Sequence, residues 1–233
     1  MMDAITYFVG ITLFLFIRYT PIDKEEVHLG SLFGRLKGGF KYLKLNPNIF
    51  AFGTLSYILF AFTLVQVHIL LPTYVEKFMH SSADVYASAE VYYSIGAILS
   101  GVLVYRIFSK YNEYLSVILL MFVVSIAFLG MSFSNNLFLF FTANLILGVT
   151  NAGVRILRTT YLFSHVPNNL IGRASSVFSS INVVIRMILI SIFSIPFFLE
   201  SDNIRWGYFV GAVLVLLTVI ILLYYYFKEK KSN

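Results

Sequence analysis

The sequence predicts an all-α fold, a polytopic membrane helix bundle with about seven transmembrane helices. Hydrophobic residues make up 59% of the 233 residues and charged residues only 12%, whereas a soluble domain has about 25% charged residues. The apolar residues gather in seven long stretches, and the basic residues fall on alternate connections between them. The first pattern predicts helices that cross a bilayer, and the second predicts their orientation.

A bilayer core about 30 Å thick requires about 20 apolar residues in a helix. Six of the stretches reach that length, whereas the first is short. Short connections between the later stretches predict that successive helices are antiparallel neighbours. The expected order is a truncated first helix within 1–18, a cytoplasmic loop over 19–48, a six-helix bundle over 49–228 and a tail over 229–233. The seven stretches are residues 4–18, 49–75, 85–107, 114–133, 136–154, 174–199 and 206–227.

The distribution of Lys and Arg predicts the orientation. If the C-terminus lies inside, 14 of the 17 basic residues lie on inside connections. Only Lys77 and Arg205 lie outside, and Arg186 lies within a helix. Because cytoplasmic loops are enriched in Lys and Arg, we expect a multi-pass protein of the cell (inner) membrane with a cytoplasmic C-terminus. The inside residues are Arg18, Lys24, Arg35, Lys37, Lys41, Lys44, Arg106, Lys110, Arg155, Arg158, Arg173, Lys228, Lys230 and Lys231.

Several classes of function are disfavoured by composition and motifs. The net charge of +6 lies in loops where orientation already explains it, so no nucleic-acid partner is expected. The absence of cysteine excludes disulfides, thiolate metal sites and cysteine nucleophiles. The sequence has no HExxH motif, paired aspartate motif or Gly-rich phosphate loop. It therefore predicts neither an enzyme nor a cofactor or metal.

The second half of the long connection over 19–48 is amphipathic. Its apolar residues share one helical face, while basic residues occupy other positions. This pattern predicts a basic amphipathic helix near 30–44 at the inner membrane surface, acting as a tether or as a regulatory element. Asn46 and Pro47 then end this helix and begin the next span. The apolar face comprises Leu32, Phe33, Leu36, Phe40 and Leu43.

Polar side chains line one face of the third, fifth and sixth stretches. Lipid cannot satisfy such groups, so these faces must meet each other, another protein surface or water. The alternative for the small residues is close helix packing, which we favour for Ser94, Ala97, Gly101, Gly148 and Ala152. The last stretch is apolar on nearly every side and is expected to face lipid. The three polar faces are Glu90, Tyr93, Ser94, Ala97 and Gly101; Asn144, Gly148, Asn151, Arg155 and Arg158; and Ser175, Ser179, Asn182 and Arg186.

Arg186 is the least expected of these polar residues, because it lies near the middle of the sixth stretch. An arginine at a helix centre costs roughly 2.5–3.5 kcal/mol on insertion. It either lines a cavity or a gate, or it braces neighbouring helices by binding their carbonyl groups. Arg155 and Arg158 lie near the inner surface, where orientation or snorkelling explains them.

Glu90 lies about two turns into the third stretch from the outer side. It can pair with His68 or Arg186, carry a proton, or lie in a wet outer vestibule. His68 and Gln66 lie in the second stretch, where His68 is either an ordinary interface residue or a proton relay. The candidates for a substrate cavity or gate are Arg186, Asn182, Ser179, Asn144, Asn151, Arg155, Gln66, His68 and Glu90.

Three motifs stand together in order along the chain. They are GFKYLKLNP at 39–47, LLPTYV at 70–75 and VPNNLIGRASS at 166–176. In order and spacing they resemble the central loop, the seventh helix and the start of the eleventh helix of major facilitator superfamily transporters. The resemblance is closest to the branch of macrolide and siderophore exporters. It implies that the seven stretches are helices six to twelve of a twelve-helix fold, in which the seventh and tenth helices line the cavity.

The resemblance also implies which helices contact the other half of the transporter and which contact lipid. The eighth and eleventh helices would face the other half of the transporter, and the ninth and twelfth would face lipid. Helices one to five have no counterpart in the sequence, so an N-terminal half or another chain would supply them. The family's loop motif is eroded after the third stretch, where Tyr105 replaces the acidic residue. No gating salt bridge or coupling mechanism is carried over.

These observations predict the C-terminal half of a secondary active transporter that exports small molecules by alternating access. Its expected partners are the lipid bilayer, the missing half, a small-molecule substrate and a coupling ion, for which H⁺ is a candidate. The alternative is a complete seven-helix membrane protein that does not transport, such as a receptor or an accessory subunit.

Overall fold

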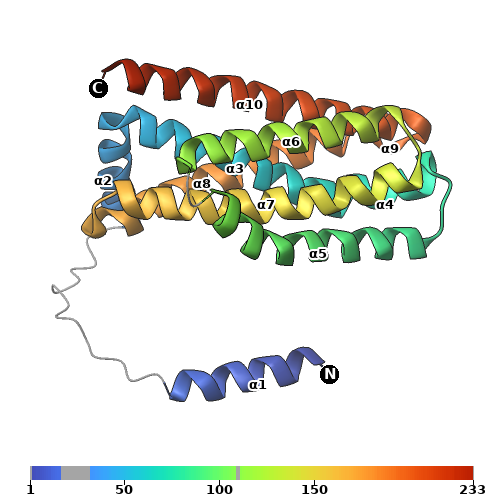
Figure 1. Cartoon of the computed structure of the whole chain (residues 1–233), viewed down its shortest axis with the longest axis horizontal. Helices are drawn as coiled ribbons and strands as arrows, with labels where there is room; N and C mark the ends of the chain where they lie inside the picture. The colour runs from blue at the N-terminus through green and yellow to red at the C-terminus, as the bar shows by residue number, and fades with distance from the viewer. Residues whose placement is uncertain (1, 17–31, 109–110, 233) are drawn as a thin grey trace. The chain divides into compact units, whose positions relative to one another are not determined.

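The computed structural model describes residues 2–16, 32–108 and 111–232, and all regular structure in these ranges is helical (Figure 1). The chain divides into two compact units, Met1–Arg35 and Leu36–Asn233. The α-helices are α1 (Met2–Leu15), α2 (Leu32–Leu45), α3 (Pro47–Val65), α4 (Leu71–Thr73), α5 (Ala83–Phe108), α6 (Glu113–Phe133), α7 (Leu137–His165), α8 (Asn168–Phe193), α9 (Pro196–Leu199) and α10 (Ile204–Ser232). Two π-helices, η1 (Gln66–Leu70) and η2 (Tyr74–Phe78), flank α4, and a 3₁₀-helix, η3 (Ser201–Asn203), precedes α10.

The second unit contains the predicted membrane helices. Within the described residues, six helical segments are long and apolar enough to cross a membrane. The predicted all-α polytopic bundle is therefore confirmed. The segments are Pro47–Phe78, Ala83–Val104, Glu113–Phe133, Leu137–His165, Asn168–Phe193 and Ile204–Lys231. The first unit contains α1, which covers most of the short stretch predicted over 4–18.

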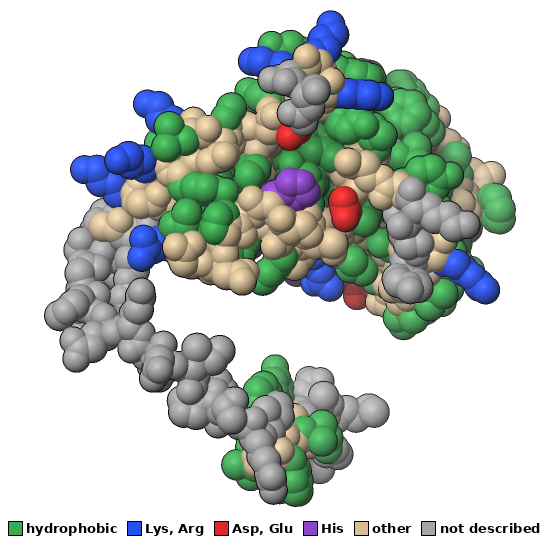
Figure 2. Space-filling model, turned by 60° about the vertical axis from the view of Figure 1, so that its left-hand side comes forward, with side chains coloured by type: hydrophobic (Ala, Val, Ile, Leu, Met, Phe, Trp, Pro, Cys, Tyr) green, Lys and Arg blue, Asp and Glu red, His purple; other side chains and the backbone are tan. Residues whose placement is uncertain are grey.

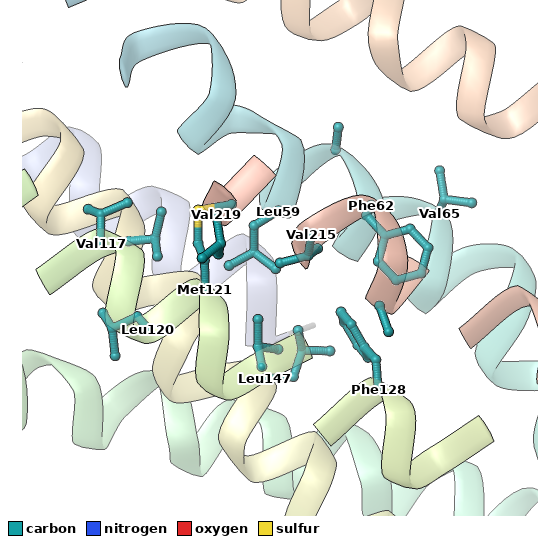
Figure 3. Packing of buried hydrophobic residues seen from close by; sticks show 14 of the residues in the cluster. Leu59, Phe62, Val65, Val117, Leu120, Met121, Phe128, Leu147, Val215 and Val219 are labelled. Atoms are coloured by element: carbon teal, nitrogen blue, oxygen red, sulfur yellow. The ribbon is translucent and has the colours of Figure 1, made fainter. Parts of the chain in front are cut away.

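The core of the second unit lies between α3, α6, α7 and α10. Figure 3 shows Leu59 and Phe62 of α3 among side chains of the other three helices. Met121 of α6 and Val215 of α10 are completely buried there. The last span is therefore only half exposed to its surroundings. One face packs in this core, and the opposite face leaves Leu217 53% exposed.

The second predicted span is less regular than expected. Proline lacks a backbone N–H, and its ring clashes with the carbonyl group four residues earlier. Pro72 lies in α4, and the helix is wound as π-helix on both sides of it. Such π-helical turns are frequent at functional sites. They place Gln66, Val67 and His68 on a widened turn.

The predicted sixth span, 174–199, had the wrong limits. The residue before a proline disfavours the α conformation, and Ile195 has ψ 136° ahead of Pro196. Helix α8 therefore ends at Phe193, and α9 follows as a separate short helix. Arg186 lies seven residues before the end of α8 (193 − 186) rather than at the middle of a continuous helix. Helix α7 also continues past the predicted residue 154 to His165.

A helix forms in the predicted amphipathic stretch. Leu43 of α2 is completely buried, Leu36 is half-buried and Phe40 is 49% exposed. The side chains of Leu32 and Phe33 lie outside the described residues. Gly39 packs against the backbone at the start of α8, where an added Cβ would lie 2.6 Å from the carbonyl oxygen of Arg173. Glycine in this helix therefore permits a close approach.

Candidate functional site

Helices α5 and α7 are held together by a reciprocal pair of glycines. A Cβ added to Gly96 of α5 would meet the carbonyl oxygen of Leu145, and one added to Gly148 of α7 would meet that of Tyr93. Asn151 reinforces this contact, because its Nδ2 donates to the Tyr93 hydroxyl at 2.8 Å. The close packing expected of Gly148 is present. The same expectation for Gly101 is wrong within this chain, because an added Cβ there would meet nothing within 4 Å.

A cavity of about 240 Å³ lies beside this contact, between η1, α4, α5 and α7. It brings together Glu90 and Asn144, two of the sequence-predicted candidates. Ser94, which the sequence assigned to packing, is exposed and also lines the cavity. Ser94 lies one turn from Glu90 on the same helix, and this spacing could have identified Ser94 as a cavity residue from the sequence. The lining residues are Val67, Leu71, Ala89, Glu90, Tyr93, Ser94 and Asn144.

The cavity presents two hydrogen-bond acceptors between apolar walls. Glu90 is exposed, and its Oε1 accepts from the Tyr86 hydroxyl at 2.7 Å. Asn144 is only 1% exposed, and its Nδ2 donates to the Phe140 carbonyl at 2.9 Å. No described residue donates to the Oδ1 of Asn144. Pockets of this composition bind small molecules that have an apolar body and a few polar groups.

The second predicted span does not contribute its polar residues to this cavity. Gln66 is completely buried, and its Nε2 donates to the hydroxyl of Tyr208 in α10 at 3.3 Å. Its Oε1 has no partner among the described residues. His68 is exposed, and neither His68 nor Arg186 contacts Glu90 in the described part of the chain. The partner of Glu90 is Tyr86 instead.

The polar face predicted on the sixth span is divided in the structure. Asn182 is 5% exposed and donates from Nδ2 to the Tyr57 carbonyl of α3 at 3.3 Å. Ser179 is exposed. Arg186 is half-buried, and in the ranges that the structure describes it forms no hydrogen bond or ion pair. The bundle therefore leaves the Arg186 guanidinium free to bind something else.

Arg158 differs most from its sequence interpretation. It is 4% exposed, so it does not snorkel to the inner surface. Its Cζ lies 3.5 Å from the centroid of the Tyr57 ring, and its Nη1 donates to the Ser56 carbonyl at 3.2 Å. Arg158 braces α7 against α3. The sequence could not show this, because nothing in it pairs Arg158 with residues about a hundred positions away. Arg155, on the same helix, is exposed.

Replacing Arg158 with alanine should lower the unfolding free energy by about 1–3 kcal/mol, because a charge-assisted hydrogen bond and a buried cation–π contact are lost. Arg155→Ala removes the same charge from an exposed position of the same helix, and we expect a change within about 0.5 kcal/mol. Denaturant unfolding of the purified protein in detergent measures both. Equal losses for the two variants would contradict the bracing role.

Comparisons with known proteins identify the family. Residues 1–190 match the Major Facilitator Superfamily, which covers well over half of the chain. No curated protein and no solved structure matches the chain. The transporters of this family bind small-molecule substrates in the lipid bilayer, and the six apolar helices agree with that setting. The chain therefore belongs to the Major Facilitator Superfamily and is a multi-pass membrane protein of the transporter kind.

Proposed function

We propose that this chain forms the C-terminal half of a secondary active transporter that exports small amphipathic molecules by alternating access. The observation that carries the proposal is the cavity between η1, α4, α5 and α7, where Glu90 and the free Oδ1 of Asn144 lie between apolar walls. Val67, Leu71 and Ala89 contact the apolar body of the substrate. Glu90 and Asn144 accept hydrogen bonds from its donor groups.

Alternating access needs rigid bodies that rock around a fixed site. The glycine contact between α5 and α7 makes these two helices one body, with the cavity on its side. The π-helical turns around Pro72 allow the wall of the cavity formed by η1 and α4 to change shape. The substrate is then bound between one body that stays packed and one segment that moves.

The N-terminal half of the transporter covers the exposed faces of α5 and α8. Ile98 of α5 is 74% exposed, and Met187 of α8 is 61% exposed. The motif resemblance assigns these helices to the eighth and eleventh positions, which face the other half. Helices one to five, supplied by the same polypeptide or by another chain, complete the cavity in this proposal. Arg186 of α8 then meets that half or the water between the halves.

H⁺ is the proposed coupling ion, and Glu90 is its proposed carrier. Glu90 is the one carboxylate that lines the cavity among the described residues. Its hydrogen bond from Tyr86 holds it beside Tyr93 and Ser94 on one side of α5. Protonation removes its charge without moving the helix, so substrate and proton can compete for the same oxygen atoms.

An efflux assay tests the proposal. Cells that express the protein with its other half are loaded with a macrolide antibiotic or with ethidium. The amount of probe that they retain is compared with the amount retained by cells that lack the protein. We expect faster loss of at least one probe, and we expect Glu90→Gln and Asn144→Leu to abolish that gain. Glu200→Gln, at an exposed position beyond α9, is the matched control. Equal retention of every probe with and without the protein would favour a seven-helix receptor or accessory subunit.

The proposed orientation gives a prediction of its own. The chain has no cysteine, so a single introduced cysteine reports its own location. In intact cells we expect an impermeant thiol reagent to label Lys77→Cys and to leave Arg173→Cys and Lys230→Cys unlabelled, because cytoplasmic loops are enriched in basic residues. Labelling at position 173 without labelling at position 77 would reverse the topology.

A further inference from the structure

A second cavity, of about 270 Å³, lies at another place in the bundle, between the start of α6 and the ends of α7 and α10. It shares no residue with the Glu90 cavity, and the proposed transport function does not use it. On the face drawn in Figure 2, a histidine lies near acidic side chains, with Lys and Arg side chains toward the edges. The lining residues are Asn112, Tyr114, Tyr161, His165, Tyr226, Glu229 and Lys230.

Three tyrosines from three helices form one wall of this cavity. The ring of Tyr114 lies 5.8 Å from that of Tyr161 and 5.6 Å from that of Tyr226, centroid to centroid. Phe52 of α3 supports this wall, at 4.6 Å from Tyr114 and 4.1 Å from Tyr161. Aromatic faces attract organic cations, above all ammonium groups.

One polar group of this wall has no partner. Tyr114 is 2% exposed, and its buried hydroxyl makes no hydrogen bond among the described residues. Native proteins rarely leave a buried polar atom unpaired, because its desolvation is then not compensated. An unpaired hydroxyl in a residue that lines a cavity indicates a ligand that supplies the missing partner.

The charged groups of the cavity are also unpaired. In the ranges that the structure describes, neither Glu229 nor Lys230 takes part in an ion pair. The Nδ1 of His165 lies 2.9 Å from the Tyr161 carbonyl oxygen. A carbonyl only accepts, so Nδ1 carries a hydrogen and the Nε2 of His165 remains available. One carboxylate, one ammonium group and one imidazole nitrogen therefore face a single cavity with no protein partner.

The position of the cavity indicates where its ligand comes from. Tyr224, Tyr225 and Tyr226 stand where an interfacial aromatic belt is expected. The lysines that follow, Lys228, Lys230 and Lys231, are predicted to be cytoplasmic. On the sides of the same helices, Leu119 of α6 and Phe227 of α10 are 51% and 54% exposed. The cavity thus lies at the expected level of the inner-leaflet headgroups, on helices whose exposed sides carry apolar side chains suited to acyl chains.

We propose that this cavity binds an ethanolamine phosphate group, in the form of the headgroup of phosphatidylethanolamine. The primary ammonium group donates to Glu229 and to the Nε2 of His165 and lies against the tyrosine wall, and the phosphate accepts from Lys230 and Tyr114. A purely anionic headgroup would bind Lys230 but would leave the carboxylate of Glu229 without a donor. A choline headgroup can contact the aromatic rings but has no N–H to donate to the carboxylate.

The thermal stability of the purified chain in detergent tests this assignment. We expect phosphatidylethanolamine to raise the melting temperature more than equal amounts of phosphatidylglycerol or phosphatidylcholine, because bound ligand stabilises the folded state. Glu229→Gln, Lys230→Gln and Tyr114→Phe should each lose most of that shift. Lys231→Gln, an exposed neighbour that does not line the cavity, should keep it.

Three outcomes would overturn the assignment. A shift from phosphatidylglycerol as large as that from phosphatidylethanolamine would indicate ordinary attraction to basic residues. A shift from soluble phosphoethanolamine equal to that from the lipid would keep the headgroup chemistry but reject the membrane as its source. An unchanged lipid shift in the Glu229→Gln and Lys230→Gln variants would place the lipid elsewhere on the protein.

Discussion

Replacing Gly148 with alanine should destabilise the bundle by roughly 1–3 kcal/mol, the usual cost of overpacking an interior. The added Cβ would lie 2.8 Å from the carbonyl carbon of Tyr93 and 3.0 Å from the amide nitrogen of Ala97, and it would also meet the Tyr93 carbonyl oxygen. These are backbone atoms of α5, so no side-chain rotation relieves the contact. The two helices must separate, which also lengthens the hydrogen bond from the Asn151 side chain to the Tyr93 hydroxyl.

Gly101→Ala is the matched control for this prediction. Gly101 lies on α5 as well, and an added Cβ there would meet nothing within 4 Å. Alanine favours an α-helix over glycine by roughly 1 kcal/mol, so we expect the variant to be neutral or slightly stabilised. Denaturant or thermal unfolding in detergent measures both variants. If Gly148→Ala is as stable as Gly101→Ala, the close contact between α5 and α7 is absent from the protein.

Replacing Arg186 with leucine should abolish or sharply reduce transport while leaving insertion intact. The change removes a charge from a membrane helix, where an arginine costs at most the roughly 2.5–3.5 kcal/mol of a helix-centre position on insertion scales, so expression should not fall. In the described residues the guanidinium has no protein partner, so its loss should not unfold the bundle. We infer that it acts on the substrate, on water or on the other half of the transporter.

Arg186→Lys separates charge from geometry at the same position. The lysine ammonium keeps the positive charge but lacks the planar fork of the guanidinium, so we expect only partial rescue of transport. Efflux in cells at matched expression measures both variants. Normal efflux by the leucine variant would show that Arg186 takes no part in transport.

The membrane helices were predictable because their signal is local. A stretch of about 20 apolar residues identifies a span by itself, and six such spans are present in the structure. Pro72 and Pro196 were visible too, yet their effects were not predicted. A proline disrupts a helix in several ways, and only the structure shows π-helix around Pro72 and a complete break before Pro196.

The candidate site was predictable only in part, because its geometry depends on partners far away in the sequence. The sequence assigned both Gly101 and Gly148 to close helix packing, but of these two only Gly148 meets another backbone. The same reasoning assigned Arg158 to the inner surface, whereas Tyr57 and Ser56 of α3 hold it inside the bundle. Composition identifies which residues are polar, and packing decides which of them face a cavity.

We propose that the polar side of α5 borders a water-filled path that opens alternately to the two sides of the membrane. Ser94→Cys tests it most directly, because Ser94 lines the cavity and the chain contains no other cysteine. Leu217→Cys, on the exposed apolar face of α10, is the control. We expect an impermeant thiol reagent to label position 94 both in intact cells and in inside-out vesicles, and to label position 217 in neither. Labelling of position 94 from one side only, or from neither side, would contradict alternating access at this cavity.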